Sequence, residues 1–327
     1  MKLDVRDLLK SLMAALLLAC SAAAVHADDY PSKPIRWIVG YPPGGGSDFL
    51  ARTIGAQLGA QLDRPVIVDN KAGAAGMIAA DLVARSPGDG YTIFSADNGI
   101  LIYNPALYKK INYNPDKDFV CLGLLARVPL VLVAAPNSGL TSAGSALAII
   151  KTKPDTFSYA SPGTGSPHHL AMELLKQSTG LFITHIPYRG AAPAMQDVMG
   201  GQVPLMVADT STALTHIKSG KLVPLLVLSA KRVAQLPDVP TAKEMGYKDV
   251  EAYAWQGLVV PASTPQSIRD RLTKEAEAAI ANPAVRKNLV DAGWEPSPSD
   301  AQLMAAYMMA ENRKWQSLIR ARGITAQ

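Results

Sequence analysis

A glycine-rich stretch near the N-terminus has the composition of an anion-binding turn: Tyr41-Pro42-Pro43-Gly44-Gly45-Gly46-Ser47-Asp48. Three consecutive glycines free the backbone to bend and leave no Cβ in the way of a close ligand. Because the first amides of a helix lack partners and lie at the positive end of its dipole, such a turn binds anions without a cationic side chain. The alternative is an ordinary glycine-rich turn that binds nothing.

The residues on either side of this turn predict a strand and a helix. Residues 35–39 are mostly apolar, as in a short buried strand. Leu50, Ile54, Leu58 and Leu62 follow at four-residue spacing and form one apolar face of a helix. We therefore expect the serine or the aspartate of the turn to cap this helix.

A similar arrangement recurs in the second half of the chain. Ser161-Pro162-Gly163-Thr164-Gly165-Ser166 also follows a short apolar run and precedes a helical pattern. The small residues of 73–76 have a weaker counterpart in 190–193. Two similar α/β lobes that face each other would bring two sets of helix N-termini around one cleft, which favours ligand binding.

Composition limits the class of protein. The 327 residues suffice for two domains with a sizeable core. A content of 48% hydrophobic and 18% charged residues indicates a globular protein. Only 6% of the residues are aromatic, and the net charge of +5 is dispersed. Stacking platforms would be scarce and no dense basic run occurs, so we expect no nucleic-acid partner.

The N-terminus has the three parts of an export signal. A basic region leads into the apolar run 12–19, and small residues follow up to Ala27. We predict cleavage near Ala27 and a periplasmic location, with lipoprotein-type processing at Cys20 as the second interpretation. The apolar run is too short for a permanent membrane span. The mature chain then keeps Cys121 as its single cysteine and has no intrachain disulfide.

Predicted strands and helices alternate through most of the chain. This alternation indicates an α/β fold with mostly parallel sheets, whose ligands sit at the carboxyl ends of the strands. We expect residues 95–98 to form one of the turns at that edge. The apolar runs 119–125 and 129–135 are predicted as two strands, split by Arg127, near the passage between lobes. The predicted division is a signal peptide of 1–27, a first lobe of 28–125 and 236–327, and a second lobe of 126–235.

An ordered set of motifs resembles a known receptor family. Besides the glycine-rich turn, the set includes Gly73-Ala74-Ala75-Gly76, Asn104-Pro105-Ala106-Leu107-Tyr108, Gly163-Thr164-Gly165-Ser166, Pro187-Tyr188-Arg189-Gly190 and Gly200-Gly201-Gln202-Val203. In this order they resemble the extracytoplasmic solute receptors of tripartite tricarboxylate transporters, the Bug-type receptors, over nearly all of the mature chain. The resemblance implies a type II periplasmic-binding-protein fold, with two lobes and a ligand cleft between them.

The resemblance also implies which residues bind the ligand. Backbone amides and ordered water from the first lobe's loops would hold a ligand carboxylate, and the second lobe would complete the cleft. The candidates in the first lobe are Gly45, Gly46, Ser47, Asp48, Ala75 and Ser95, with Tyr41 as a wall of the cleft or a packing residue. The candidates in the second lobe are Thr164, Gly165, Ser166, Tyr188, Gly190 and Asp209.

The chain departs from the family pattern at three places. Pro167-His168-His169 stands where the family usually has one histidine, Arg189 stands where lysine is common, and Asp97-Asn98-Gly99 differs from the family's third loop. All three lie where ligand selectivity is set, so the resemblance does not identify the ligand.

Several polar residues have both a functional and a structural interpretation. Arg189 could pair with a second ligand carboxylate, but a surface or interlobe role is favoured, and for Arg127 hinge structure is favoured. Asp209 would accept hydrogen bonds from a ligand amine or hydroxyl, or else cap the next helix. His168 and Glu173 with the histidine between them are a remote zinc alternative. We expect neither a metal nor a cofactor.

The function favoured by these observations is a non-enzymatic receptor. It would capture a small organic carboxylate (a mono-, di- or tricarboxylate or an aromatic acid) and, as a monomer, deliver it to the permease subunits of a tripartite tricarboxylate-type transporter. A sensor that feeds a signalling partner is the alternative. A periplasmic hydrolase is less favoured because Gly-x-Ser-x-Gly is absent. A nucleotide binder is less favoured because the P-loop ending and Gly-x-Gly-x-x-Gly are absent.

Overall fold

The computed structural model describes residues 30–154 and 156–326. The fold described here is that of the compact unit that begins at Lys33. The predicted export signal lies outside the described residues. Within the described ranges, no helix has both the length and the apolar character needed to cross a membrane.

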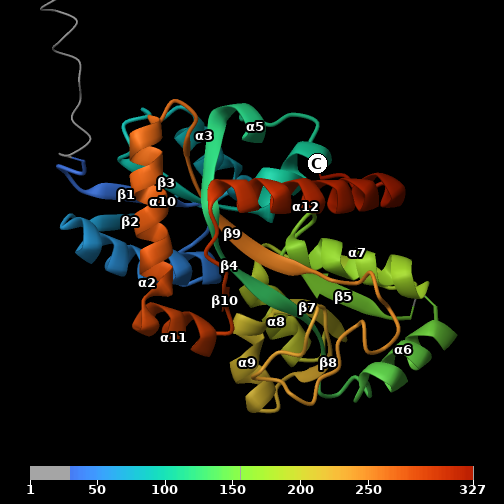
Figure 1. Ribbon diagram of the computed structural model, residues 1–327. Coiled ribbons are helices and arrows are strands. Elements are labelled where there is room, and N and C mark those ends of the chain that lie inside the picture. The colour runs from blue at the N-terminus through green and yellow to red at the C-terminus, as the bar shows by residue number, and fades with distance from the viewer. Residues whose placement is uncertain (1–29, 155, 327) are drawn as a thin grey trace, which may run out of the picture. The chain divides into compact units, whose positions relative to one another are not determined.

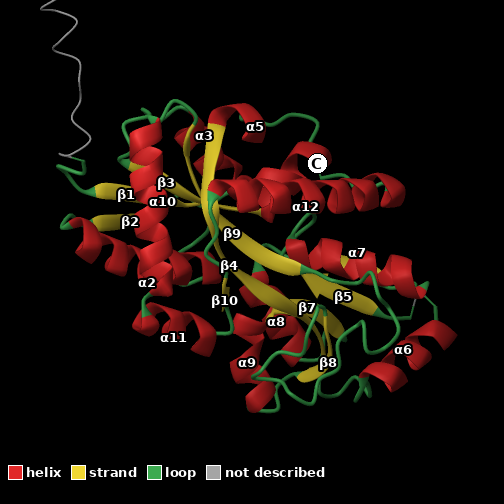
Figure 2. Ribbon diagram, viewed as in Figure 1, coloured by secondary structure: helices red, strands yellow, loops and turns green. Residues whose placement is uncertain are grey.

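Within the described residues, ten strands form one sheet (Figure 1). Eight of them follow the order β2-β1-β3-β9-β4-β7-β5-β6. The other two, β8 and β10, each pair with β4. Figure 2 shows the strands in yellow between helices in red. The strands are β1 (Ile35–Val39), β2 (Val66–Asn70), β3 (Thr92–Asp97), β4 (Phe119–Ala134), β5 (Ser158–Ser161), β6 (Thr184–Pro187), β7 (Leu205–Asp209), β8 (Val223–Val227), β9 (Tyr253–Pro261) and β10 (Glu295–Pro296).

The sheet is mixed. β1 runs parallel to β2 and β3, and β5 runs parallel to β6 and β7, as the alternation of strands and helices predicts. β9 comes from the last third of the chain and lies antiparallel between β3 and β4. β4 is also antiparallel to β7, β8 and β10. Parallel pairing therefore belongs to the outer strands and antiparallel pairing to the long central ones.

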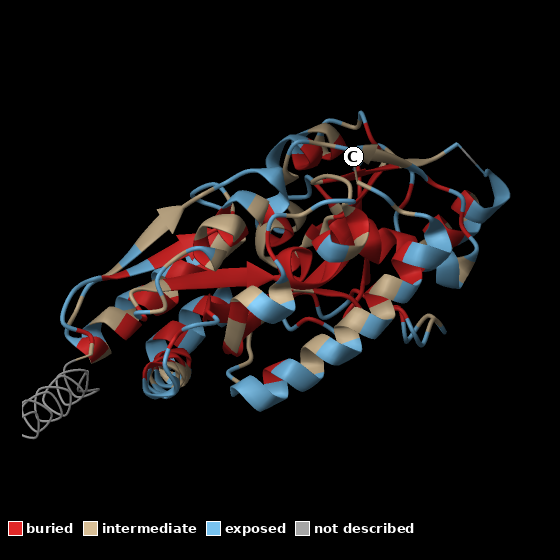
Figure 3. Cartoon of the chain, turned by 90° about the horizontal axis from the view of Figure 1, so that it is seen from above, coloured by how far each residue is buried: buried red, intermediate tan, exposed pale blue. Residues whose placement is uncertain are grey.

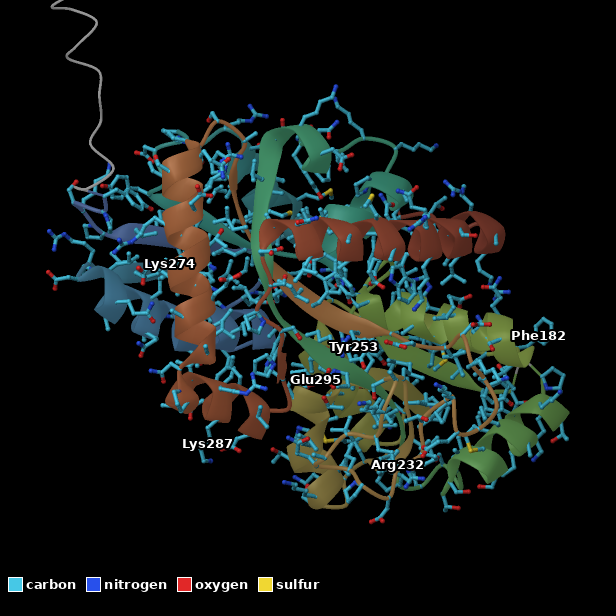
Figure 4. The ribbon with its side chains drawn as sticks, in the orientation of Figure 1. Phe182, Arg232, Tyr253, Lys274, Lys287 and Glu295 are labelled. Atoms are coloured by element: carbon cyan, nitrogen blue, oxygen red, sulfur yellow. The ribbon has the colours of Figure 1, made fainter. Side chains whose placement is uncertain are left out.

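The prediction of two strands around Arg127 is wrong, because β4 continues for 16 residues through that position. The Arg127 side chain leaves the strand and finds its own partners: its Nε donates to Glu295 Oε2 at 2.8 Å, and its guanidinium lies 4.0 Å from the centre of the Tyr253 ring. Figure 4 labels Tyr253 on β9 and Glu295 on β10. Arg127 thus joins three neighbouring strands, which agrees with the structural role favoured for it.

The helices cover the sheet. They are α2 (Gly46–Leu62), α3 (Met77–Ala84), α4 (Asn104–Leu107), α5 (Pro115–Asp118), α6 (Ala143–Thr152), α7 (Pro167–Thr179), α8 (Ala191–Met199), α9 (Thr210–Lys218), α10 (Gln266–Ala281), α11 (Pro283–Asp291) and α12 (Ala301–Arg322), with a 3-10 turn η2 (Ala74–Gly76) and a π-helical turn η3 (Gly99–Tyr103). α10 packs on α2, and α12 lies along α7 (Figure 1).

The apolar face predicted for the first helix is confirmed. Leu50, Ile54, Leu58 and Leu62 of α2 are all buried. Buried residues run along the central strands, and the outer helix faces stay exposed (Figure 3). This packing fixes where α2 begins, and so where its first amides lie.

Candidate functional site

The glycine-rich turn ends at Gly45, which is the N-cap of α2 and forms no side-chain cap hydrogen bond. The prediction that Ser47 or Asp48 caps the helix is therefore wrong. The first intrahelical bond runs from Phe49 N to Gly45 O at 2.9 Å. The amides of the preceding residues, from Gly46 onward, have no acceptor within the helix. They form the donor set expected of an anion site at the positive end of a 17-residue helix.

The Asp48 carboxylate holds this turn together. It accepts hydrogen bonds from Gly44 N at 2.9 Å, from Asn70 Nδ2 at 3.0 Å and from Arg52 Nε at 2.9 Å. Burial by itself would raise the pKa of Asp48, but these three hydrogen bonds outweigh it and hold the pKa below its usual value. An ionised carboxylate can only accept hydrogen bonds. Since its oxygens are engaged in this way, Asp48 shapes the turn and does not itself hold an anion.

Tyr41, which is half-buried, and Asp97, which is buried, form a hydrogen-bonded pair beside the turn. Tyr41 Oη donates to Asp97 Oδ2 at 2.5 Å, and the other carboxylate oxygen accepts from Ile100 N at 2.9 Å. Burial raises the pKa of Asp97, and the hydrogen bonds from Tyr41 and nearby amides offset this only in part. Burial also raises the pKa of Tyr41, and the adjacent Asp97 raises it further. The pair closes the end of β3, where the chain departs from the family pattern.

Two other first-half candidates differ in exposure. Ser95 lies inside β3 instead of in a turn at the sheet edge, because the strand continues to Asp97. Its hydroxyl accepts from Trp37 Nε1 at 2.7 Å and is buried. Ala75 is exposed and lies in a left-handed conformation with φ of 52°, held by Asn104 Nδ2, which donates to its carbonyl at 3.0 Å. A strained non-glycine conformation of this kind is often found where function requires it.

The second glycine loop precedes α7. Ser166 is the N-cap of α7 and accepts from His169 N at 3.2 Å, while Gly165 N donates to His169 Nδ1 at 3.0 Å. A Cβ on Gly165 would lie only 2.4 Å from Leu107 Cδ1 of α4, so this loop touches the first half of the chain. Thr164 is half-buried beside it. The loop therefore contributes to a contact between the two halves.

Tyr188 and Gly190 both interact with α8, one through a side-chain hydrogen bond and the other as its N-cap. Tyr188 Oη donates to Asp197 Oδ2 at 2.6 Å, and burial followed by this bond raises the pKa of Tyr188 to about 12. Gly190 is the N-cap of α8, and its amide donates to Pro162 O at 3.0 Å. Arg189 between them is exposed, as its favoured surface role predicts.

Asp209 is the N-cap of α9, but its side chain does not cap the helix. Its Oδ1 lies 3.1 Å from Nε2 of His168 on α7. Both atoms are buried, and apart from this contact neither has a polar partner in the part of the chain that the structure describes. Ser211 Oγ, also buried near the start of α9, has no partner there either. The N-termini of α7 and α9 therefore meet at polar groups with unused hydrogen-bonding capacity.

Gly293 and Trp294 connect these helices to α2. Thr210 Oγ1 donates to Gly293 O at 3.2 Å, and a Cβ on Gly293 would lie 3.1 Å from Ser211 Cα. On the other side, Trp294 Cζ2 lies 3.1 Å from the Cβ position of Gly46. We call this place the three-helix junction: the first residues of α2, α7 and α9 around Gly293 and Trp294.

Sequence reasoning missed two residues of the junction. Gln256 on β9 donates through Nε2 to Ser47 Oγ at 2.8 Å, and its Oε1 is buried with no partner among the described residues. Trp294 Nε1 is also buried and has no hydrogen-bond partner among the described residues. Both residues are separated from the glycine-rich turn by more than two hundred positions, and no local pattern in the sequence links them to it.

Buried polar atoms without partners are concentrated at the junction. Leaving one unpaired costs about 1–3 kcal/mol, so proteins rarely keep several at one place without a reason. The atoms at the junction are His168 Nδ1 and Nε2, Asp209 Oδ1, Ser211 Oγ, Gln256 Oε1 and Trp294 Nε1. Four further atoms of this kind lie on Asn98, Thr264, Arg269 and Asn312. The junction therefore combines free helix amides with several buried polar atoms that lack partners among the described residues.

Two of the three residues in the zinc alternative, His169 and Glu173, are engaged in other contacts. The His169 ring stacks on His185 with centroids 4.0 Å apart. The Glu173 carboxylate accepts from Tyr159 Oη at 3.0 Å, Lys176 Nζ at 2.6 Å and Arg322 Nε at 3.0 Å. Among residues 30–154 and 156–326, no group of three or more metal-ligating side chains is placed to hold a metal ion.

Comparison with known proteins finds relatives over nearly the whole chain. A family described as "Tripartite tricarboxylate transporter family receptor" matches residues 50–324. Protein BugT of Bordetella pertussis (strain Tohama I) is 35% identical over 303 residues, which are 92% of this chain and 93% of that protein.

Solved structures with the same fold include two with more than 30% identity. The periplasmic binding protein BugD superposes with a TM-score of 0.82 and 34% identity, over 91% of this chain and 100% of that one. R. palustris Rpa4515, solved with adipate, superposes with a TM-score of 0.85 and 32% identity, over 91% of this chain and 99% of that one. The α/β fold is therefore that of the periplasmic solute-binding proteins.

Proposed function

The chain belongs to the tripartite tricarboxylate transporter receptor family, and we propose that it captures a small organic carboxylate at the three-helix junction. Members of this family are periplasmic solute-binding receptors and not enzymes. We further propose that the protein is exported by a signal peptide cleaved near Ala27, acts as a monomer and hands its ligand to permease subunits of a tripartite tricarboxylate-type transporter.

The observation that carries the proposal is the meeting of three helix N-termini beside buried polar atoms that lack partners. α2, α7 and α9 have 17, 13 and 9 residues, so each presents a developed positive end of its dipole. A carboxylate placed there would accept hydrogen bonds from the first amides of α2. The indole of Trp294 adds a donor at the same helix end.

The candidate residues take different roles in this proposal. Gly45, Gly46 and Ser47 offer backbone amides to the carboxylate, and Gln256 orients Ser47. Tyr41, Asp48 and Ser95 act indirectly, because their polar atoms hold the surrounding turns and strands. Ala75, Thr164, Gly165 and Ser166 form the walls, and Asp209 accepts from the ligand. Tyr188 and Gly190 keep the second glycine loop in place, since the carbonyls of Ser161 and Pro162 accept from their amides.

Ligand entry requires the junction to open. Gly165 touches Leu107 across the proposed division, so a carboxylate reaches the junction only after this contact separates. Trp294 touches Gly46 within the first lobe and has to turn aside there. We propose that residues 28–125 with 236–327 move relative to residues 126–235, through the strands β4 and β9. Ligand binding would then shift an equilibrium between open and closed states.

The test is thermal unfolding of the exported, processed protein against a panel of carboxylates. A ligand at a hundredfold its dissociation constant should stabilise the protein by about 2.7 kcal/mol. An ester substrate serves as the control for turnover. A shift with carboxylates and no ester hydrolysis supports the receptor. No shift with any aliphatic or aromatic acid contradicts carboxylate capture.

A further inference from the structure

The buried polar atoms at the junction differ in whether they can donate or accept hydrogen bonds. The Trp294 indole Nε1 can only donate, whereas the Asp209 carboxylate and the Gln256 carbonyl oxygen can only accept. Trp294 Nε1 and Gln256 Oε1 are buried without a partner among the described residues, and Asp209 Oδ1 has His168 Nε2 at 3.1 Å. Gln256 Oε1 therefore needs a hydrogen-bond donor from the ligand, and the Asp209 carboxylate, which has more lone pairs than one histidine can fill, can accept from ligand donors as well.

A carboxylate alone cannot supply those donors. Its oxygens can accept from Trp294 Nε1 and from the α2 amides, but they leave Gln256 Oε1 unpaired and offer no donor to the Asp209 carboxylate. A second ligand carboxylate at this position would in addition bring two like charges together in a buried site, which is unfavourable. The junction thus disfavours both plain acids and diacids that lack a donor.

The acceptors lie close to the place proposed for the carboxylate. Gln256 is bonded to Ser47 in the first turn of α2, and Trp294 touches Gly46 in the same turn. Asp209 stands at the start of α9, whose next two residues contact Gly293. His168 lies against Asp209 Oδ1 from α7. A donor carried a few bonds from the ligand carboxylate would therefore reach these oxygens.

We propose that the preferred ligand is a carboxylate that also carries a hydrogen-bond donor, a hydroxyl or an ammonium group, near its carboxylate. Asp209 and Gln256 accept from this donor, while the α2 amides and Trp294 hold the carboxylate. This inference rests on the proposed function and makes it specific for a ligand class. The two sources of the donor differ in charge, so the test separates them.

The test is isothermal titration calorimetry with acids matched in carbon skeleton. One series is butyrate, 2-hydroxybutyrate, 3-hydroxybutyrate, 3-aminobutyrate and succinate, and an aromatic series is benzoate, 3-hydroxybenzoate, 3-(aminomethyl)benzoate and isophthalate. In the series that binds, the hydroxy or amino acid should bind about tenfold or more tightly than both the plain acid and the diacid, because the buried Gln256 oxygen gains a partner and the Asp209 carboxylate meets a donor instead of a second negative charge. The relative affinity of hydroxyl and amino members identifies the donor.

Three variants connect this preference to the residues. Asp209→Ala should reduce it to less than about threefold by removing an acceptor of the ligand donor, whereas Trp294→Phe removes only an N–H that holds the carboxylate and should weaken all the acids alike without changing their ratios. Asp209→Asn should relieve the penalty on the diacid, since it removes the negative charge and keeps an acceptor. Asp238→Asn is the matched control, because Asp238 is exposed, and should leave the ratios unchanged.

The outcomes separate this inference from the proposed function. Tighter binding of the plain acid or the diacid, an unchanged preference over the plain acid in Asp209→Ala, or an unchanged preference over the diacid in Asp209→Asn would overturn the donor inference and leave carboxylate capture standing. Failure of every acid in both series to bind would overturn both. Circular dichroism of each variant shows whether it is folded, and Asp209→Asn keeps the test valid if Asp209→Ala unfolds.

Discussion

Trp294 lies across the N-terminus of α2, with its ring atom Cζ2 3.1 Å from the position that a Cβ on Gly46 would occupy. The next residue back, Gly293, lies equally close to Ser211 at the start of α9. One dipeptide therefore separates two helix ends that come from distant parts of the chain. A ligand at the α2 amides must displace this ring or bind beside it. Ligand affinity should therefore be sensitive to small changes at Gly46.

Replacing Gly46 by valine should abolish carboxylate binding. The branched side chain would collide with Trp294 and block the first amides of α2, and overpacking of this kind costs about 1–3 kcal/mol of stability. Calorimetric titration measures the affinity. Gly144→Val is the control, because Gly144 is exposed in the first turn of α6 and its Cβ position is 3.9 Å from the nearest heavy atom, Met245 Cε. Wild-type affinity in Gly46→Val would mean that the ligand binds elsewhere.

The strained turn at Ala75 should depend on Asn104. Its side chain donates to Ala75 O, and Ala74 and Ala75 both have positive φ. Non-glycine residues in this region cost about 1–3 kcal/mol each, so Asn104→Ala should let the turn relax. We expect weaker ligand binding together with faster amide hydrogen exchange in residues 73–76. Unchanged exchange in this turn would show that the hydrogen bond does not hold it.

Acid should destabilise the protein through a stacked histidine pair. Burial lowers the pKa of His169 to about 3 and that of His185 to about 4, whereas a free histidine titrates near 6.5. Because the folded pKa values are lower than the unfolded one, the stabilisation is complete above about pH 6.5 and is lost as the pH falls toward 4. His185→Phe keeps a ring in the stack and removes one of the two titrations.

Urea unfolding at pH 7 and pH 4.5 measures this effect. The wild-type protein should lose about 2 kcal/mol more unfolding free energy between these pH values than His185→Phe does. Equal losses in the two proteins would contradict the assignment. His216→Phe is the matched control, since His216 belongs to α9 and lies outside the stack.

Glu173 should fasten the C-terminal helix to α7. Its carboxylate is buried and lies 2.9 Å from Arg322 Nη2 of α12 and 2.6 Å from Lys176 Nζ. Burial would raise the pKa of Glu173, but the bonds to Lys176 and Arg322 lower it below the usual value. Breaking a buried ion pair by removing one partner costs about 3–5 kcal/mol, and the exposure of Arg322 reduces this figure.

A double-mutant cycle isolates this contact. Glu173→Gln and Arg322→Met should each lower the free energy of unfolding in urea, and the double variant should lose less than the sum of the two. Additive losses would mean that the two side chains do not interact. Ligand affinity should stay close to that of the wild type, because neither residue belongs to the three-helix junction.

Local sequence determined the elements that carry the site. The spacing of Leu50, Ile54, Leu58 and Leu62 predicted α2 and its buried face, and the glycines before it predicted the turn that precedes the free amides. These features depend on contacts a few residues apart, so the order of residue types suffices to predict them. The ordered motifs also predicted the receptor family, which the comparisons confirm.

Tertiary structure alone decided how these elements are used. Asp48 turned out to hold the glycine turn: Arg52 is one turn away on the same helix, but Asn70 comes within hydrogen-bond distance only after β2 has paired with β1. Gln256 and Trp294 reach α2 through β9 and the end of α11, more than two hundred residues along the chain. Hydrogen bonds and packing of this kind depend on the folded positions of distant segments. Unpaired buried atoms, which identify the junction, can be recognised only when every neighbour is in place.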